Sequence, residues 1–288
     1  MSLENSPDPP PPPEREGERP MNPFEATMWA FGSVVALNML FQGALLVLPG
    51  LRTDSAGQAL CQVLAYLPLL ILLQYVYFPR TRPGALFATS AAGSWVFYPI
   101  ALLLGIAIHA PTNAIYDAAL QRWPDTTPVE VISRSFKDLA LWQKVATGLG
   151  LVVTTPLIEE AMFRGALFGT LRRRHDAVTV VIVTAVLFAF IHLQPQAFLP
   201  IGIVGASLAF LRVASGSMWP SVVMHAAFNG ATFYAMAAGL TEEPAASQPI
   251  PTSLVVGGSV VTAGLLALTE HLRARRRRLQ PAPEQETS

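Results

Sequence analysis

The chain has 288 residues, of which 52% are hydrophobic and only 13% are charged, and its mean hydropathy is +0.42. Soluble domains carry about 25% charged residues, so this composition excludes a water-soluble globule, a disordered chain and a nucleic-acid binder with a basic face. The formal net charge of zero averages an acidic N-terminal segment against a basic C-terminal one. The single cysteine, Cys61, excludes an intrachain disulfide and a cysteine-based zinc site.

Apolar stretches fill the chain between residues 26 and 273. Residues 1–25 are rich in proline and acidic residues, which predicts a disordered tail, and residues 274–288 predict a basic and polar tail. A membrane-spanning helix needs about 20 mostly apolar residues, and its backbone groups must pair within the helix. We therefore predict an all-α polytopic membrane protein of eight transmembrane helices, at 27–48, 56–78, 85–109, 145–171, 177–194, 197–215, 217–240 and 253–272.

The basic residues predict the orientation of these spans. With eight spans, arginines 15, 19, 80, 82, 172–174, 212, 273 and 275–278 fall on the side of both termini. The opposite side holds Arg52, Arg122, Arg134, Lys137 and Lys144. Because positive charge is enriched in cytoplasmic loops, we expect both termini in the cytoplasm. The excess of arginine over lysine further favours the inner membrane of a bacterium as the location.

One sizeable extramembrane stretch is expected, at 110–144. Apolar residues recur within it at helical spacing from Val129 to Trp142, with charged residues between them. This pattern predicts an amphipathic helix that lies on the membrane surface.

Ionisable and polar groups occur deep in three of the predicted spans. They are Glu159, Glu160 and Arg164 in the fourth, His192 in the fifth, and His225 and Asn229 in the seventh. A charged side chain at the centre of a spanning helix costs about 2.5–3.5 kcal/mol on insertion scales. At 1.5 Å of rise per residue their depths overlap, so three helices can bring these groups to one buried site.

The spacing of these groups predicts their roles. Glu160 and Arg164 stand four residues apart with the acid first, which favours a helical ion pair. Glu159 then has no local partner, and a carboxylate in a low-dielectric cavity can act as a general base. His192 would share the same water molecule. His225 and Asn229 could donate hydrogen bonds to the oxyanion that forms when water attacks a peptide carbonyl.

Other chemistries and functions remain open at this stage. The zinc motif His-Glu-x-x-His does not occur, and no aspartate lies deep in a span, which excludes an intramembrane aspartyl dyad. We expect no cofactor, although glutamate and histidine side chains could also ligate zinc. Buried carboxylates and histidines also build proton or ion pathways. A scaffold or immunity protein could use the same polar cluster for helix packing alone.

Three motifs carry a resemblance to a known family. The segments Glu159-Glu160-Ala-Met-Phe-Arg164-Gly165, Phe188-Ala-Phe-Ile-His192 and His225-Ala-Ala-Phe-Asn229 resemble the motifs of the CAAX-protease and bacteriocin-processing family, within a core at 140–240.

The resemblance implies an eight-helix intramembrane protease with a cavity open to the cytoplasm. The family has been described both as metalloproteases and as metal-independent glutamate proteases, and we favour the glutamate type because one base and two histidines account for every role. Its substrate would be a membrane-associated peptide or lipidated protein, cut near its C-terminus. Glu159 and His192 would activate water, Glu160 and Arg164 would hold the geometry, and His225 with Asn229 would form the oxyanion hole.

Overall fold

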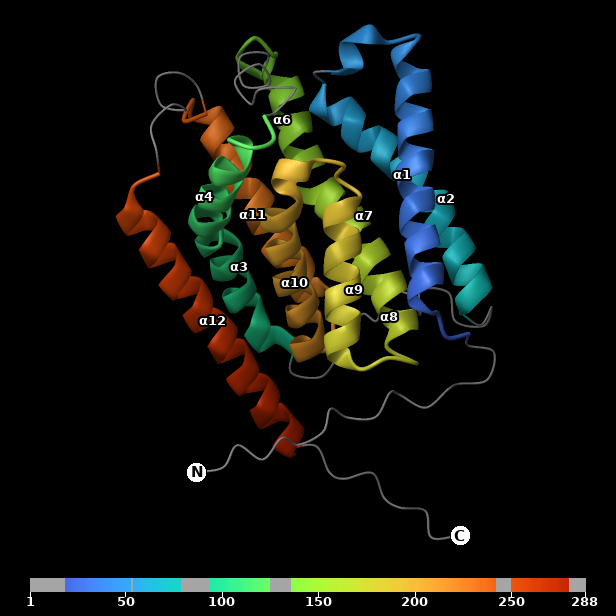
Figure 1. Ribbon diagram of the computed structural model, residues 1–288. Helices are drawn as coiled ribbons and strands as arrows, with labels where there is room; N and C mark the ends of the chain where they lie inside the picture. The colour runs from blue at the N-terminus through green and yellow to red at the C-terminus, as the bar shows by residue number, and fades with distance from the viewer. Residues whose placement is uncertain (1–18, 53, 79–93, 125–135, 242–249, 280–288) are drawn as a thin grey trace.

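The computed structural model describes residues 19–52, 54–78, 94–124, 136–241 and 250–279, and the regular elements within these ranges are all helices (Figure 1). The α-helices and their bounds are α1 (Pro23–Leu45), α2 (Ser55–Tyr77), α3 (Phe97–Ala107), α4 (His109–Leu120), α6 (Leu141–Leu149), α7 (Thr155–Glu160), α8 (Phe168–Leu171), α9 (Ala177–Phe190), α10 (Phe198–Ser215), α11 (Trp219–Ala237) and α12 (Thr252–Leu279). Short 3₁₀ turns lie at Pro49–Arg52 (η1), Ser94–Val96 (η3) and Pro195–Ala197 (η6).

A helix overlaps each of the eight predicted spans, and the all-helical membrane fold is confirmed for the described residues. Six stretches are long and apolar enough to cross a membrane: Pro23–Leu45, Ala56–Tyr77, Phe97–Leu120, Leu141–Leu171, Pro195–Ser215 and Thr252–Arg278. Helix α9 is apolar but shorter, at 14 residues. Helix α11 lies at the seventh predicted span and contains His225 and Asn229. The number of eight spans therefore stays a prediction.

The helices differ from the predicted boundaries at both ends of the chain. Helix α1 begins at Pro23, inside the segment predicted as a tail, because Asn22 and Glu25 form a capping box. Helix α12 continues through the arginines to Leu279, where cationic side chains suit the negative end of the helix dipole. Residues 1–18 and 280–288 of the predicted tails lie outside the described residues.

The predicted extramembrane stretch 110–144 was wrong in its first part. Residues 109–120 form α4, which follows α3 after a single residue, so that Phe97–Leu120 is one candidate span. Three polar residues of α4, Thr112, Asn113 and Tyr116, line a cavity of the bundle. Half of the predicted amphipathic helix, residues 129–135, lies outside the described residues.

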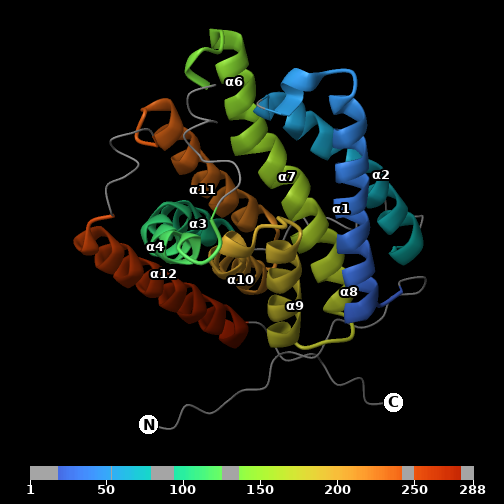
Figure 2. The same ribbon diagram turned by 45° about the horizontal axis from the view of Figure 1, so that its top comes forward.

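The bundle places the motif-bearing helices together. Helix α9 packs along α10, α11 packs against both α3 and α10, and α7 lies between α2 and α11. Figure 2 shows α3 and α4 between α12 and α11, with the α1–α2 pair on the opposite flank. The approach of α3 to α11 depends on Gly105, because a Cβ there would overlap the Met224 carbonyl and stand 2.8 Å from the Ala227 Cβ. This crossing fixes α11 at the residue before His225.

Candidate active site

The two glutamates lie in a helix whose backbone is irregular on both sides of them. Within Leu141–Leu171, α7 is flanked by two π-helical segments, η4 at Gly150–Thr154 and η5 at Ala161–Leu167. π-helical turns are rare and are frequent at functional sites. The first segment, η4, rotates the residues that follow it relative to an uninterrupted α-helix, so it helps to decide which way Glu159 and Glu160 face.

Pro156 leaves one backbone carbonyl of the first π segment without an N–H donor from its own helix. In that register the N–H of Thr155 donates to the Gly150 carbonyl, five residues earlier. The next such bond would join residue 156 to the Leu151 carbonyl, but proline has no N–H. Asn229 from α11 donates its Nδ2–H to this carbonyl instead, at 2.9 Å. The motif asparagine is therefore anchored to the backbone of the motif helix.

Glu160 and Arg164 form the predicted ion pair. The Arg164 Nη1 donates to Glu160 Oε1 at 2.9 Å, and both side chains are 0% exposed. The other guanidinium nitrogen, Nη2, donates to the Gly205 carbonyl of α10 at 2.7 Å. The guanidinium carbon also lies 4.5 Å from the centre of the Phe188 ring of α9. One buried arginine thus joins three helices.

His225 lies between the two carboxylates. Its Nδ1 is 3.0 Å from Glu160 Oε1 and its Nε2 is 3.8 Å from Glu159 Oε2. Because Glu160 is paired with a guanidinium and accepts, Nδ1 carries a proton. The cluster holds two carboxylates and one guanidinium, so a second proton on His225 would neutralise the remaining charge. Its buried ring stands edge-on to Phe188, with 5.7 Å between the ring centres.

Glu159 has a partner that the sequence analysis did not include. Gln62 of α2 donates its Nε2–H to Glu159 Oε1. The Glu159 side chain is buried rather than facing lipid, at 5% exposure. A carboxylate held by one amide donor keeps acceptor capacity for a further proton, which is what a general base requires.

His192 occupies the turn after α9. Its Nδ1 donates to the Phe188 carbonyl at 2.7 Å, which leaves the Nε2 lone pair as the acceptor. The next residue, Leu193, has φ 54°, a backbone conformation uncommon outside glycine and often found at functional sites. The chain therefore reverses directly after the histidine. Among the described residues, no hydrogen bond or ion pair joins His192 to Glu159.

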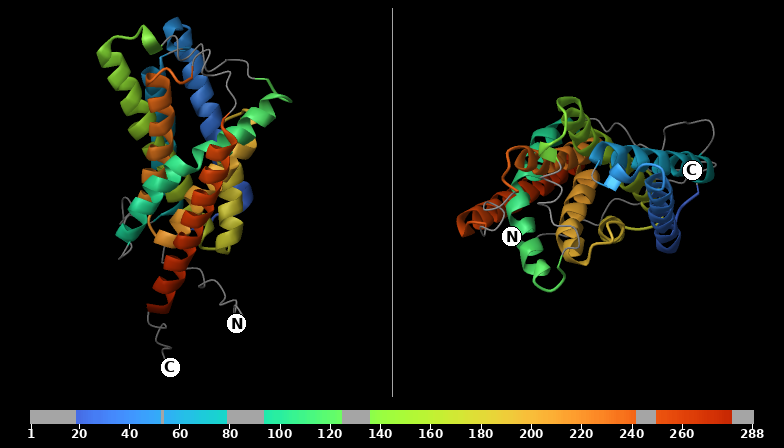
Figure 3. Two further views of the ribbon diagram at one scale, coloured as in Figure 1. Left: turned by 90° about the vertical axis from the view of Figure 1, so that its left-hand side faces the viewer. Right: turned by 90° about the horizontal axis from the view of Figure 1, so that it is seen from above.

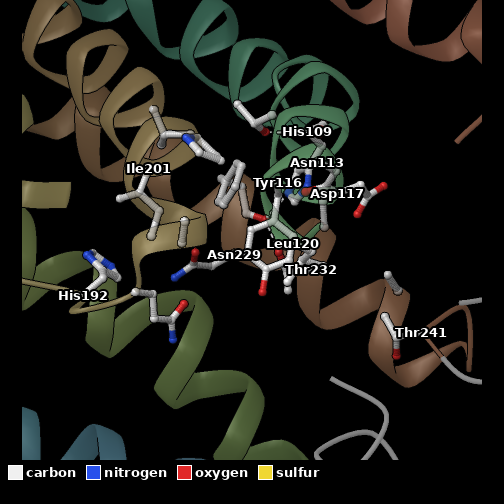
Figure 4. A pocket seen from close by; sticks show the side chains of 18 of the residues that line it. His109, Asn113, Tyr116, Asp117, Leu120, His192, Ile201, Asn229, Thr232 and Thr241 are labelled. Carbon is white, nitrogen blue, oxygen red and sulfur yellow. Dashed lines mark hydrogen bonds between the residues drawn. The ribbon is translucent and has the colours of Figure 1, made fainter. Parts of the chain in front are cut away.

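A cavity of about 880 Å³ brings the catalytic candidates together (Figure 4). His192, His225 and Asn229 line it, whereas Glu159 and Glu160 reach it through their contacts with His225. The remaining wall comes mainly from α4, α10 and α11 and includes Leu120, Ile201, Val204, Phe228 and Thr232. All six predicted residues are thus joined by direct contact or shared lining, and Arg164 is joined through its ion pair with Glu160.

His109 is a second residue that sequence reasoning missed, because it lies at the end of a predicted span. It stands at the junction of α3 and α4, where its Nε2 donates to the Phe228 carbonyl at 2.7 Å. Its ring stacks on that of Phe228 with 4.0 Å between centres. The repeat of His109, Asn113 and Asp117 every fourth residue is the signal that could have identified a polar helix face on the cavity.

The cluster does not fit a zinc site well. Within the described part of the chain, no three His, Cys, Asp or Glu side chains are arranged to hold a metal ion. Glu160 Oε1 already accepts from both Arg164 and His225, and the guanidinium would repel a cation. We therefore assign no step to a metal.

The comparison with known families agrees with the motifs. Residues 141–231 match the family model described as type II CAAX prenyl endopeptidase Rce1-like. No curated protein and no solved structure matches the chain. The resemblance to the CAAX-protease family is confirmed over the segment that contains all six candidate residues, and the several apolar helices identify a multi-pass membrane protein.

Proposed function

Starting from this family match, we propose that the chain is an intramembrane endopeptidase that hydrolyses a peptide bond in a membrane-associated peptide or protein. The observation that carries the proposal is that His192, His225 and Asn229 line one cavity while Glu159 contacts His225 from behind. A protease needs a base, an oxyanion site and a space for the substrate. These residues can supply all three.

Water activation is assigned to Glu159 and His192. The unprotonated Nε2 of His192 and the free acceptor capacity of Glu159 can take the proton of a water molecule as its oxygen attacks the carbonyl carbon. When the tetrahedral intermediate collapses, the carbon–nitrogen bond breaks and that proton passes to the leaving amine. General acid–base catalysis of this kind contributes about 10²- to 10⁴-fold in rate.

Oxyanion stabilisation is assigned to His225 and Asn229. Because Nδ1 of His225 donates to Glu160, its Nε2 can donate to an oxyanion only when the ring carries both protons. One amide N–H of Asn229 is used by Leu151, which leaves the second for the substrate. Removing one such donor lowers kcat by about 10²- to 10³-fold.

The test uses purified full-length chain and a quenched fluorescent peptide with an apolar sequence. Glu159→Gln and His192→Ala should each lower cleavage by about 10²-fold or more, with unchanged folded yield on size-exclusion chromatography. Glu270→Gln and His271→Ala, both exposed on α12, serve as matched controls and should keep full activity. Full activity of either site variant would refute the assignment.

Two further measurements separate the alternatives. Cleavage that survives a strong chelator supports the glutamate mechanism, whereas loss of cleavage that zinc restores would contradict it. Glu159-dependent ion flux in liposomes, without peptide cleavage, would instead support a proton or ion pathway.

A further inference from the structure

The cavity occupies one end of the helix bundle. Its lining comes from the whole length of α4, the stretch of α11 from His225 to Ala235, the N-terminal half of α10, Phe188 near the end of α9, and residues that follow α9 or precede α12. The lining extends to Leu120 at the end of α4 and to Pro124 just after it. It also includes Leu240 and Thr241, which follow the end of α11. All these segments lie toward the upper end of the bundle in Figure 1.

The opposite end of the bundle is basic, and hydrogen bonds join its segments. Arg19, before α1, donates its backbone N–H to the Tyr77 carbonyl at the end of α2. Arg173, in the turn before α9, donates to the same carbonyl. Arg276, near the end of α12, donates to the carbonyls of Ala214 and Ser215 at the end of α10.

The two ends are separated by about the length of a helix. Helix α9 runs from the basic turn to His192, and its 14 residues span about 21 Å. Along α10, Ile201 lines the cavity and Arg212 lies 11 positions later, about 16 Å away. Figure 3 shows the same separation from the side, with the start of α1 and the end of α12 at one end.

The described basic residues are distributed unequally between these ends. At the basic end lie Arg19, Arg172, Arg173, Arg174, Arg212, Arg273, Arg275, Arg276, Arg277 and Arg278. At the cavity end lie Arg52, Arg122, Lys137 and Lys144. Since loops rich in Lys and Arg stay in the cytoplasm, the basic end is the cytoplasmic one.

We infer that the cavity opens on the non-cytoplasmic face of the membrane, opposite to the face that the family resemblance implies. If the proposed peptidase function holds, the substrate is a polypeptide segment that reaches the site from outside the cytoplasm. A protein anchored by a prenyl group on the cytoplasmic leaflet would not reach this opening.

The charged side chains of the cavity lining further restrict which peptides suit the site. Among the described lining residues, Asp117 is the single Asp, Glu, Lys or Arg side chain, and most of the others are apolar or uncharged. A bond three residues from a C-terminus would bring a free carboxylate within about 10 Å of the site. With no Lys or Arg in the described lining to receive that carboxylate, the cavity suits an apolar segment with neutral or basic residues.

Cysteine labelling tests the orientation without reference to activity. In the full-length chain with Cys61→Ser, single cysteines are placed at the cavity end by Gln121→Cys or Trp123→Cys, and at the basic end by Arg174→Cys or Arg278→Cys, all exposed positions. In intact spheroplasts, a membrane-impermeant maleimide should label the first pair, and should label the second pair only after permeabilisation. The reverse pattern would overturn the inference. Two reporters at each end keep the test decisive if one variant fails to fold.

Vesicles of defined orientation test the side from which substrate enters. Right-side-out vesicles should cleave the added peptide directly, and inside-out vesicles only after detergent is added. Cleavage by intact inside-out vesicles alone would overturn the inference while the proposed hydrolysis stands. If the solubilised chain cleaves no peptide, the proposed function fails, and the labelling still decides the orientation.

A single substitution tests the preference of the cavity for basic over acidic peptides. Asp117→Asn should lower the ratio of kcat/KM for a lysine-containing over a glutamate-containing peptide by about tenfold, as expected for one screened charge interaction. An unchanged ratio would overturn the role of Asp117 in substrate selection.

Discussion

Two long apolar helices of this protein have opposite surroundings. The Leu141–Leu171 helix has 39% of its most apolar window buried and contains Glu159, Glu160 and Arg164, whereas the Thr252–Arg278 helix has 11% buried. Groups of three other helices bond the first: the Gln62 side chain of α2 donates to Glu159, the Gly205 carbonyl of α10 accepts from Arg164, and the Asn229 side chain of α11 donates to a backbone carbonyl. The second packs mainly along α3 and α4 and keeps its charges near its C-terminal end.

The difference shows what hydropathy does and does not specify. Lipid chains are as apolar as leucine, so burial of apolar surface does not by itself pull one spanning helix onto another. Helix α12 can therefore remain at the periphery. The Leu141–Leu171 helix must be enclosed, because its carboxylates and guanidinium need hydrogen-bond partners that lipid cannot provide.

The largest expected effect follows from removing the buried cation. Arg164→Met leaves Glu160 buried without its guanidinium partner, which costs about 3–5 kcal/mol for a broken buried ion pair. The matched change on the peripheral helix, Arg275→Met, removes an exposed charge and should cost less than about 0.5 kcal/mol. Equilibrium unfolding in mixed micelles measures the loss of stability in each of the two variants. Equal stability of the two variants would contradict the contrast between the helices.

The contact between α2 and the motif helix gives the next effect. Gln62→Leu removes the amide that bonds Glu159, and a hydrogen bond to a charged group is worth about 1.5–3 kcal/mol. Ser259→Ala on α12 removes a hydroxyl that bonds only its own helix, and we expect little change. The same unfolding assay checks the pair, and peptide cleavage should fall in Gln62→Leu alone.

Close packing distinguishes the core from α12 in a similar way. Gly105→Ala should cost about 1–3 kcal/mol by overpacking, because its Cβ would overlap the Met224 carbonyl. Gly264→Ala on α12 meets no atom within 4 Å and should be neutral, or stabilising by up to about 1 kcal/mol through helix propensity. Thermal unfolding in detergent compares them. A tolerated Gly105→Ala would show that α3 can move away from α11.

The smallest effect concerns pH at the start of α9, outside the membrane. The pKa of Asp176 is lowered from its ordinary value of 3.8, because its carboxylate accepts hydrogen bonds from the Thr179 hydroxyl and N–H. A carboxyl whose pKa is lowered by folding stabilises the fold at pH values above its unfolded-state pKa. This contribution is lost as the pH falls through its folded-state pKa. Thermal midpoints below pH 4 should therefore fall more in the parent than in Asp176→Asn, whose cap does not titrate.

Part of the candidate site could be predicted from the sequence. The spacing of Glu160 and Arg164 predicted the ion pair that the structure contains, and the depths of the polar groups predicted that α9 and α11 approach the motif helix. These inferences depend on helical periodicity and insertion cost, which are local properties. The catalytic roles of the six residues remain the proposal stated above.

Other parts of the site could not be predicted from one sequence. Gln62 and Glu159 are 97 residues apart, and Gln62 looks like any polar residue in an apolar helix until α2 is placed against α7. His109 lay at a predicted boundary, and its role depends on the continuation of α3 into α4. The bond from Asn229 to Leu151 depends on a π register that Pro156 accompanies but does not by itself specify.

The sequence by itself determined that this protein spans a membrane, that its regular structure is helical, and that one end of its helix bundle is basic. These properties follow from composition and from the need of each spanning segment to pair its own backbone groups. Only the tertiary structure decided that His225 stands between two carboxylates, that α4 forms a cavity wall, and that the cavity lies at the end away from the arginines. Those arrangements depend on contacts between helices, where close approach and a few polar bonds select one packing among many that hydropathy permits equally.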